Sequence, residues 1–182
     1  MIREDFEDYQ VVEATVKIGE ETAIGFGPMG TLEGESDIST VEKKAEGRTL
    51  KVKKRVNKMN ITMTGHATVP VKRNIYGLSN EGLKEGIYAY GTDIAIPSMV
   101  FTAIVLDMDG NKKYMAFPLM EDVKGLSIKI DNDVTEIEMN EFEFTALADS
   151  NKKFYYEAYE DELDEETKAA WLTNFTPELV KQ

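Results

Sequence analysis

Apolar and polar residues alternate with a period of two along most of this chain. In the first such run, from Tyr9 to Ile18, the side chains of Val12, Ala14 and Val16 fall on one face. Gly, Asn and Asp residues separate runs of this kind throughout the sequence. The pattern is typical of antiparallel strands that bury one face and are joined by tight turns. It therefore predicts a mainly β fold, an antiparallel β-sandwich or barrel.

The same pattern predicts the remaining elements. Asp109-Gly110-Asn111 has the composition of a tight hairpin turn, and a bulge is expected near Asn140, where the apolar parity changes. A flanking helix is expected from Asp164, a suitable N-cap, with Trp171 anchoring it on the sheet. A short helix is expected over 71–78, and further strands are expected over 22–26, 86–91, 99–106, 113–117, 126–130, 136–148 and 154–159.

The segment 37–58 is polar and strongly basic, unlike the rest of the chain. Leu50, Val52 and Val56 alternate within it, and the apolar parity then shifts across Asn57 and Lys58. This indicates two consecutive strands, 49–56 and 59–69, with a turn or bulge between them. The basic residues singled out as subunit-interface candidates are Lys43, Lys44, Arg48, Lys51, Lys53, Lys54 and Arg55.

The polar positions of the 59–69 segment carry uncharged, strongly β-forming side chains. Such a face suits water or a partner. These positions are Asn60, Thr62, Thr64, His66 and Thr68.

Composition limits what the protein can do. Asp and Glu outnumber Lys and Arg by 34 to 21, and the resulting net charge of −13 opposes non-specific binding to phosphate backbones. The chain has no cysteine, which excludes disulfides, thiolate metal sites and a cysteine nucleophile. The acidic start lacks signal-peptide order, and no apolar run approaches membrane-spanning length. We expect a single domain over 1–182, with 1–8 as a candidate N-terminal arm.

The inventory of reactive side chains predicts a protein that is not an enzyme and has no cofactor. His66 is the single histidine, and the sequence lacks nucleophile-elbow, P-loop and dinucleotide-binding motifs. The run Asp107–Asn111 begins like a calcium loop, but Lys112 stands at the sixth position, where glycine is required, so a plain hairpin turn is the better interpretation. The acidic residues of 131–166 leave a hydrolase as an alternative.

Several phrases of the sequence resemble the major tail proteins of siphophages that infect Gram-positive bacteria. They cover the chain from Asp37 to the C-terminus. The phrases are Thr64–Pro70, Gly77–Gly91, Glu141–Asp149, Phe154–Tyr159 and Trp171–Pro177.

The resemblance implies the phage tail-tube fold and a structural virion protein. Such proteins self-assemble into stacked hexameric rings that form a hollow tail tube, which delivers the genome into the host. It also implies a tape-measure protein, a tail terminator and baseplate or initiator proteins as partners. Assembly would take place in the host cytoplasm, and the protein would have no membrane partner. DNA would pass through the tube without being bound specifically. The 37–69 segment would then be the extended strand pair for subunit assembly, and the polar face a candidate lumen lining.

The principal alternative is a β-sandwich carbohydrate-binding or baseplate adhesion module. It would require a planar aromatic row, for which the sequence offers Tyr88 with Tyr90, or Tyr155 with Tyr159.

Overall fold

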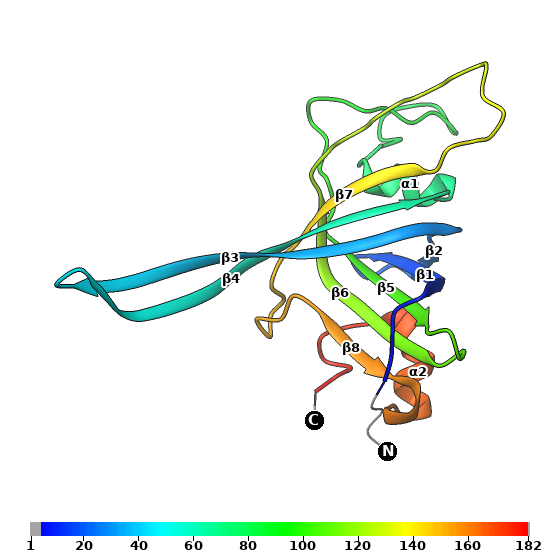
Figure 1. The fold of residues 1–182 in the computed structure, drawn as a ribbon. Coiled ribbons are helices and arrows are strands. Elements are labelled where there is room, and N and C mark those ends of the chain that lie inside the picture. Colours follow the sequence, from blue (N-terminus) through cyan, green and yellow to red (C-terminus); the bar gives the residue numbers. More distant parts are fainter. Residues whose placement is uncertain (1–4, 182) are drawn as a thin grey trace.

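The computed structural model of the chain describes residues 5–181. In this part the strands form one antiparallel eight-stranded sheet in the order β2-β1-β5-β6-β7-β4-β3, with β8 paired to β6 (Figure 1). The strands are β1 (Gln10–Ile18), β2 (Ile24–Gly25), β3 (Met29–Ala45), β4 (Arg48–Gly65), β5 (Met99–Leu106), β6 (Lys112–Asp122), β7 (Asn140–Ala146) and β8 (Tyr156–Tyr159). The helical segments are α1 (Val69–Ile75), the 3-10 turn η1 (Glu160–Glu162) and α2 (Glu165–Asn174). The predicted mainly β fold with a flanking helix is confirmed.

The main hydrophobic core joins β1, β4, β5, β6 and β7 with α1 and the segment before β3. Phe26 packs edge-on against Phe101 and Phe142, with ring centroids 6.1 and 5.6 Å apart. Met63 and Met120 are fully buried in the same cluster. Alternate residues in the body part of β1, β4 and β7 contribute to it, which explains the period of two in those segments.

A second cluster lies on the opposite face of β5 and β6, under α2. Trp171 is buried there against Phe175 and Tyr114, and its Nε1 donates a hydrogen bond to the carbonyl of Met115 at 3.0 Å. The helix begins where expected, since Asp164 accepts a hydrogen bond from the backbone N–H of Thr167 at 2.8 Å. The predictions of the terminal helix, its N-cap and its tryptophan anchor are confirmed.

The hairpin between β5 and β6 is also confirmed. The Asp107 carboxylate organises the turn by accepting hydrogen bonds from the backbone N–H groups of Asp109 and Asn111 at 2.9 and 2.8 Å. Gly110 adopts a φ of 82° in this turn. The Asp-rich run therefore serves the turn geometry itself.

The pairing of the basic segment differs from the prediction. The 49–56 and 59–69 segments do not pair with each other: residues 48–65 are one strand, β4, which pairs along its length with β3. A register shift occurs where Asp37 faces Lys58 and Ile38 faces Val56, so Asn57 is the bulge that the parity change predicted. β3 itself was missed, because most of its side chains are exposed on both faces and give no alternation.

Three other predicted elements were wrong in part or in whole. The 126–130 segment forms no strand, and 86–91 contributes only an isolated bridge between Ala89 and Ser79. β7 begins at Asn140, so the expected strand over 136–148 loses its first residues and its bulge. α1 begins at Val69 and buries Val71 and Ile75, close to the short helix that was expected.

A close backbone approach joins the start of β3 to the end of β4. Gly27 lies between two backbone hydrogen bonds that join these segments. One runs from Thr68 N–H to the Phe26 carbonyl and the other from His66 N–H to the Pro28 carbonyl, each 2.8 Å long. Its φ is 112°, and a Cβ at this position would lie 2.3 Å from the His66 carbonyl oxygen. Only glycine fits this crossing.

Candidate assembly surface

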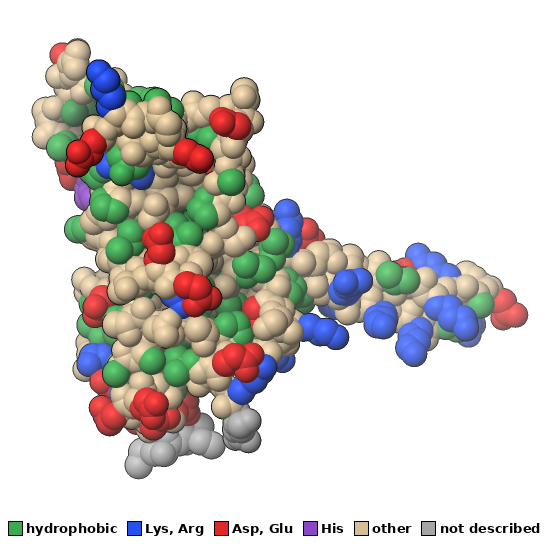
Figure 2. All heavy atoms as spheres, turned by 180° about the vertical axis from the view of Figure 1, so that it is seen from behind, with side chains coloured by type: hydrophobic (Ala, Val, Ile, Leu, Met, Phe, Trp, Pro, Cys, Tyr) green, Lys and Arg blue, Asp and Glu red, His purple; other side chains and the backbone are tan. Residues whose placement is uncertain are grey.

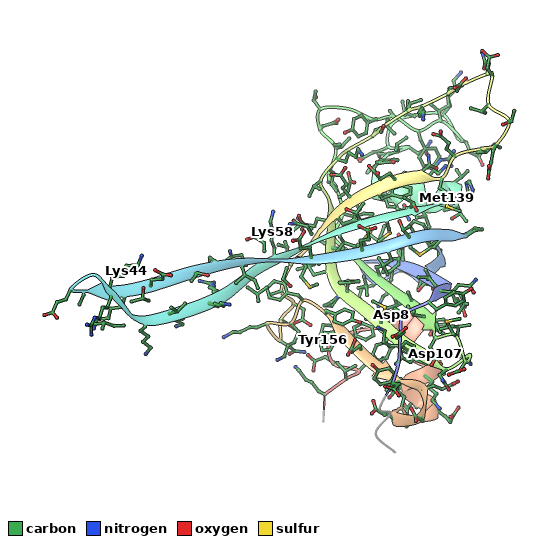
Figure 3. The ribbon with its side chains drawn as sticks, in the orientation of Figure 1. Asp8, Lys44, Lys58, Asp107, Met139 and Tyr156 are labelled. Atoms are coloured by element: carbon green, nitrogen blue, oxygen red, sulfur yellow. The ribbon has the colours of Figure 1, made fainter. Side chains whose placement is uncertain are left out.

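The outer part of the β3–β4 hairpin leaves the body of the protein as a two-stranded arm, residues 38–56 (Figure 1). Residues 38–45 alone extend roughly 25 Å at about 3.3 Å per residue. Lys58 lies near the point where the arm leaves the body, and Lys44 lies near its tip (Figure 3). Every residue of the arm is exposed, so this ribbon contributes nothing to either core cluster.

All seven basic interface candidates lie on the arm and are exposed. Figure 2 shows their side chains gathered along the arm, interspersed with hydrophobic ones, while acidic groups are scattered over the body. Lys44 forms an ion pair with Glu42, with 2.9 Å between Nζ and Oε2. The structure thus brings the predicted residues together on one projecting element, whereas their role in assembly stays a prediction.

The cross-strand register divides the arm into two faces. Pairs directly opposite each other share a face, so Arg55, Lys53 and Lys51 lie on one face beside their partners on β3. Lys51 is directly opposite Lys43. Like charges in this position destabilise a strand pair by repulsion. A basic ribbon with such a pair gains most from an external acidic partner.

The polar face of β4 is only partly continuous. Asn60, Thr62 and Thr64 point to the same side of the sheet, and the Thr64 hydroxyl is 2.9 Å from that of Thr31 on β3. His66 and Thr68 are exposed but lie beyond the end of β4. Thr68 occupies the N-cap position of α1, and its hydroxyl donates to the Gly25 carbonyl at 3.2 Å. The lumen role of these five residues is untested.

The sheet surrounds this polar face with carboxylates that sequence reasoning did not find. Thr62 lies between Glu33 on β3 and Glu143 on β7, Asn60 faces Glu35, and Thr64 faces Glu141. Alternation within each strand placed these glutamates on a solvated face, but only the register shows that they flank the threonines. The exposed side of β3, β4 and β7 is therefore acidic.

Lys124 is held over the β7 end of this acidic face. Its Nζ lies 2.7 Å from Glu141 Oε1 and 2.9 Å from Glu143 Oε1. The hydrogen bonds to Glu141 and Glu143 raise the pKa of Lys124. The lysine stays charged and fixes the two glutamates in place.

Asp122, at the end of β6, gives a testable pH dependence. Its side chain is opposite Phe144 on the core side of the sheet. Burial raises the pKa of the Asp122 carboxyl, although hydrogen bonds from the backbone N–H groups of Gly125 and Lys124 lower it. The nearby charge of Glu143 raises the same pKa further. Burial and the nearby Asp122 charge also raise the pKa of Tyr76.

We expect Asp122→Asn to remove part of the pH dependence of stability. Because the folded state holds the Asp122 proton more tightly, the wild-type free energy of unfolding should fall as the pH rises from about 3.9, the ordinary value, through the raised pKa. Above the raised pKa, the contribution of Asp122 to the free energy of unfolding no longer changes with pH. Urea unfolding between pH 3.5 and 7 should show the variant gaining on the wild type as the pH rises; a constant difference would contradict this role of Asp122.

The structure places the two aromatic pairs of the adhesion alternative in different parts of the molecule. Tyr88 lies on the loop after α1, with the Arg73 guanidinium 3.7 Å from its ring centroid. Tyr155 packs against Phe117 with ring centroids 5.1 Å apart, and Tyr159 belongs to β8, at the other end of the molecule (Figure 1). Tyr88 and Tyr90 are both exposed, so the adhesion alternative stays a prediction.

The N-terminal segment contacts the body in its described part. Phe6 packs against Tyr159 with ring centroids 5.1 Å apart, and the Asp8 carboxylate forms an ion pair with the buried Lys113. Residues 1–4 of the candidate N-terminal arm lie outside the described residues, and its role is untested.

Two searches of residues 5–181 concern metals and membranes. Within this range no group of three or more His, Asp or Glu side chains is arranged to hold a metal ion. Within the same range no helix has both the length and the apolar character needed to cross a bilayer.

Comparisons with known proteins give a distant structural likeness. No protein-family model matches the chain, and no curated protein sequence matches it. A solved structure that is similar is a chain described as "Cryo-EM structure of the anti-feeding prophage (AFP) baseplate, 6-fold symmetrised". The likeness covers 86% of this chain and 97% of that one, with 8% identity and a TM-score of 0.43. At these values it carries no argument about function.

Proposed function

We propose that this protein is a structural virion protein whose copies assemble into stacked hexameric rings, forming the tail tube of a siphophage. The observation that carries the proposal is the exposed arm, which is basic and partly apolar and projects from an acidic body. Ordering the arm costs conformational entropy, and the arm packs on nothing in its own chain. A binding partner explains why such an element is present. The family resemblance of the sequence supplies the ring number and the tube.

A second copy of the same chain is the simplest partner. The net charge of −13 leaves the body strongly acidic, so the arm of one copy is attracted to the body of another. The arm and the surface it meets differ, and such heterologous contacts generate closed rings or open filaments. The tape-measure, terminator and initiator proteins are proposed as further partners on the resemblance alone.

The acidic face around Asn60 and Thr62 suits the lumen of such a tube. DNA binds proteins mainly through cations that displace its counterions, so glutamates such as Glu33 and Glu143 would keep the duplex from adhering to the wall. Uncharged threonines between them add no specific contacts to bases. This face is our proposal for the lining through which DNA passes.

Removing the arm tests the proposal. Replacing residues 38–57 by an Asn-Gly turn between Asp37 and Lys58 should leave the free energy of unfolding nearly unchanged, because both core clusters lie outside the deleted part. Concentrated wild-type protein should form rings or tubes in negative-stain microscopy, and the arm-less variant should stay monomeric by sedimentation.

Two results would contradict the proposal. One is a wild-type protein that stays monomeric at all concentrations, salts and pH values. The other is an arm-less variant that still forms tubes. Retention of a monomeric wild-type protein on cell-wall polysaccharide would favour the adhesion alternative instead.

A further inference from the structure

One face of the arm extends the apolar row of the main core into solvent. On β4, Met63 and Ile61 are buried, and the same face continues outward through Met59 to the pair Val56 and Ile38. Ile38 is 50% exposed, and Val52, further out on this face, is 48% exposed. Within the described chain nothing covers this row beyond the body. Lys54 lies on this face between Val56 and Val52, so the face offers a partner both aliphatic and basic side chains.

A matching surface lies on the loop between β6 and β7, residues 123–139. It carries the most exposed large aliphatic side chains of the described residues: Ile128, Ile130 and Ile137 are 75%, 82% and 79% exposed. Acidic residues are interleaved with them. These are Asp131, Asp133, Glu136 and Glu138. Aliphatic side chains with acidic neighbours complement the aliphatic and basic side chains of the arm.

The loop is held in a shape that leaves a hollow. Lys129 forms an ion pair with Glu138 across its base, and the Asp131 carboxylate accepts a hydrogen bond from Asp133 N–H at 2.9 Å. Met139 lies close to Gly30 and Thr64 at the sheet. Between the loop and the segment leading into α1 is a cleft of about 350 Å³, lined by Ile130, Val134 and Ile137 among others. It is large enough to receive an aliphatic side chain.

The loop also contains a strand-forming sequence without a strand. Leu126, Ile128 and Ile130 alternate with polar residues, yet 126–130 pairs with nothing in the described chain. β3 is an edge strand, because it pairs with β4 alone, so the arm presents an unpaired backbone edge. Exposed edges of this kind accept an added strand from another molecule.

We propose that the 123–139 loop of one copy receives the arm of a second copy, with Val52 and Ile38 covering the exposed isoleucines and Lys54, on the same face of the arm, meeting the loop carboxylates. A copy cannot make this contact with itself, since its arm points away from its own loop (Figure 1). The inference rests on the proposed function and names the surface that the arm meets.

Cysteine cross-linking tests the contact directly, because the chain has no cysteine of its own. Full-length Val52→Cys is mixed with full-length Ile128→Cys, Ile130→Cys or Ile137→Cys, one of each pair carrying a size tag, under mild oxidation. A disulfide requires Cα atoms within about 7 Å, so only positions that meet will couple quickly. Met108→Cys, at the β5–β6 turn and 80% exposed, is the matched control for reactivity.

We expect at least one loop position to give a hetero-disulfide yield about ten times that of the Met108→Cys control. If the disulfide yield at all three loop positions equals that of the Met108→Cys control, the proposed contact is overturned. The outcome is separable from tube formation in the microscope. Tubes without the loop cross-link would leave the proposed function standing and remove the loop as acceptor, whereas cross-linking without tubes would keep the contact and contradict the tail tube; absence of both would contradict both.

Discussion

Changing Lys51, Lys53 and Lys54 to glutamate is expected to raise the concentration needed for assembly by at least about a hundredfold, equivalent to about 3 kcal/mol per contact. The three lysines lie together on the exposed arm. The change replaces attraction to an acidic body by like-charge juxtaposition, which costs several kcal/mol at an interface. The monomer should keep its stability, since none of the three packs in a core cluster.

A matched control separates arm charge from total charge. Lys84, Lys152 and Lys153 are exposed and lie outside the arm, and reversing them changes the net charge by the same amount. We expect this control to assemble nearly as the wild type does, as judged by sedimentation and negative-stain microscopy. Equal loss in both variants would show that general repulsion, and not the arm, governs assembly.

Salt provides a second readout of the same contact. Raising the ionic strength from 0.1 to 1 M shortens the screening length from about 10 to about 3 Å. Wild-type assembly should weaken over this range through loss of the charge attraction. The arm-reversed variant should gain, because screening reduces its repulsion.

Gly27→Ala is expected to lower the free energy of unfolding by about 3–5 kcal/mol, among the largest effects of any single substitution outside the cores. The added Cβ would lie 2.3 Å from the backbone oxygen of His66. Both hydrogen bonds flanking Gly27 would have to shift to relieve that clash. The φ of 112° adds strain, because side-chain-bearing residues rarely adopt it.

Gly82→Ala is the matched control for this substitution. Gly82 also has a positive φ, 73°, but a Cβ there would meet nothing within 4 Å. Only the backbone strain remains, so we expect a loss of about 1–2 kcal/mol. Urea unfolding of the two variants measures the difference. Equal losses would show that the Gly27 crossing relaxes easily and that the close approach does not hold β3 to β4.

The fold was largely predictable where each strand has one buried face. β1 and β7 alternate because one of their faces enters the core, whereas β5 is buried on both faces and its sequence is almost continuously apolar. The parity change at Asn57 correctly located a bulge. β3 was not predictable in this way, since the arm exposes both of its faces. The false strand at 126–130 has the opposite cause: its alternation is genuine, but pairing depends on an edge that the described chain does not offer it.

The candidate site was predictable in composition but not in geometry. The basic residues of 37–58 are dense enough to be recognised from the sequence alone, and all seven interface candidates lie on the arm. The glutamates beside Thr62 could not be assigned to the same face, because that assignment depends on which strands are neighbours. Neighbour relations between distant strands are set by the whole fold, not by local pattern.

The arm's two-stranded construction affects how growth would begin in the proposed tube. An isolated pair of strands is at best marginally stable in water, and the opposed Lys43 and Lys51 weaken this one further. We therefore expect the tip to open in a free subunit without unfolding of the body. Two free subunits that meet must order their arms for a single contact, whereas a subunit joining an existing ring makes several contacts for the same ordering. We therefore expect elongation of the proposed tube to be favoured over spontaneous nucleation, so that assembly of concentrated subunits begins slowly and speeds up once the first rings exist.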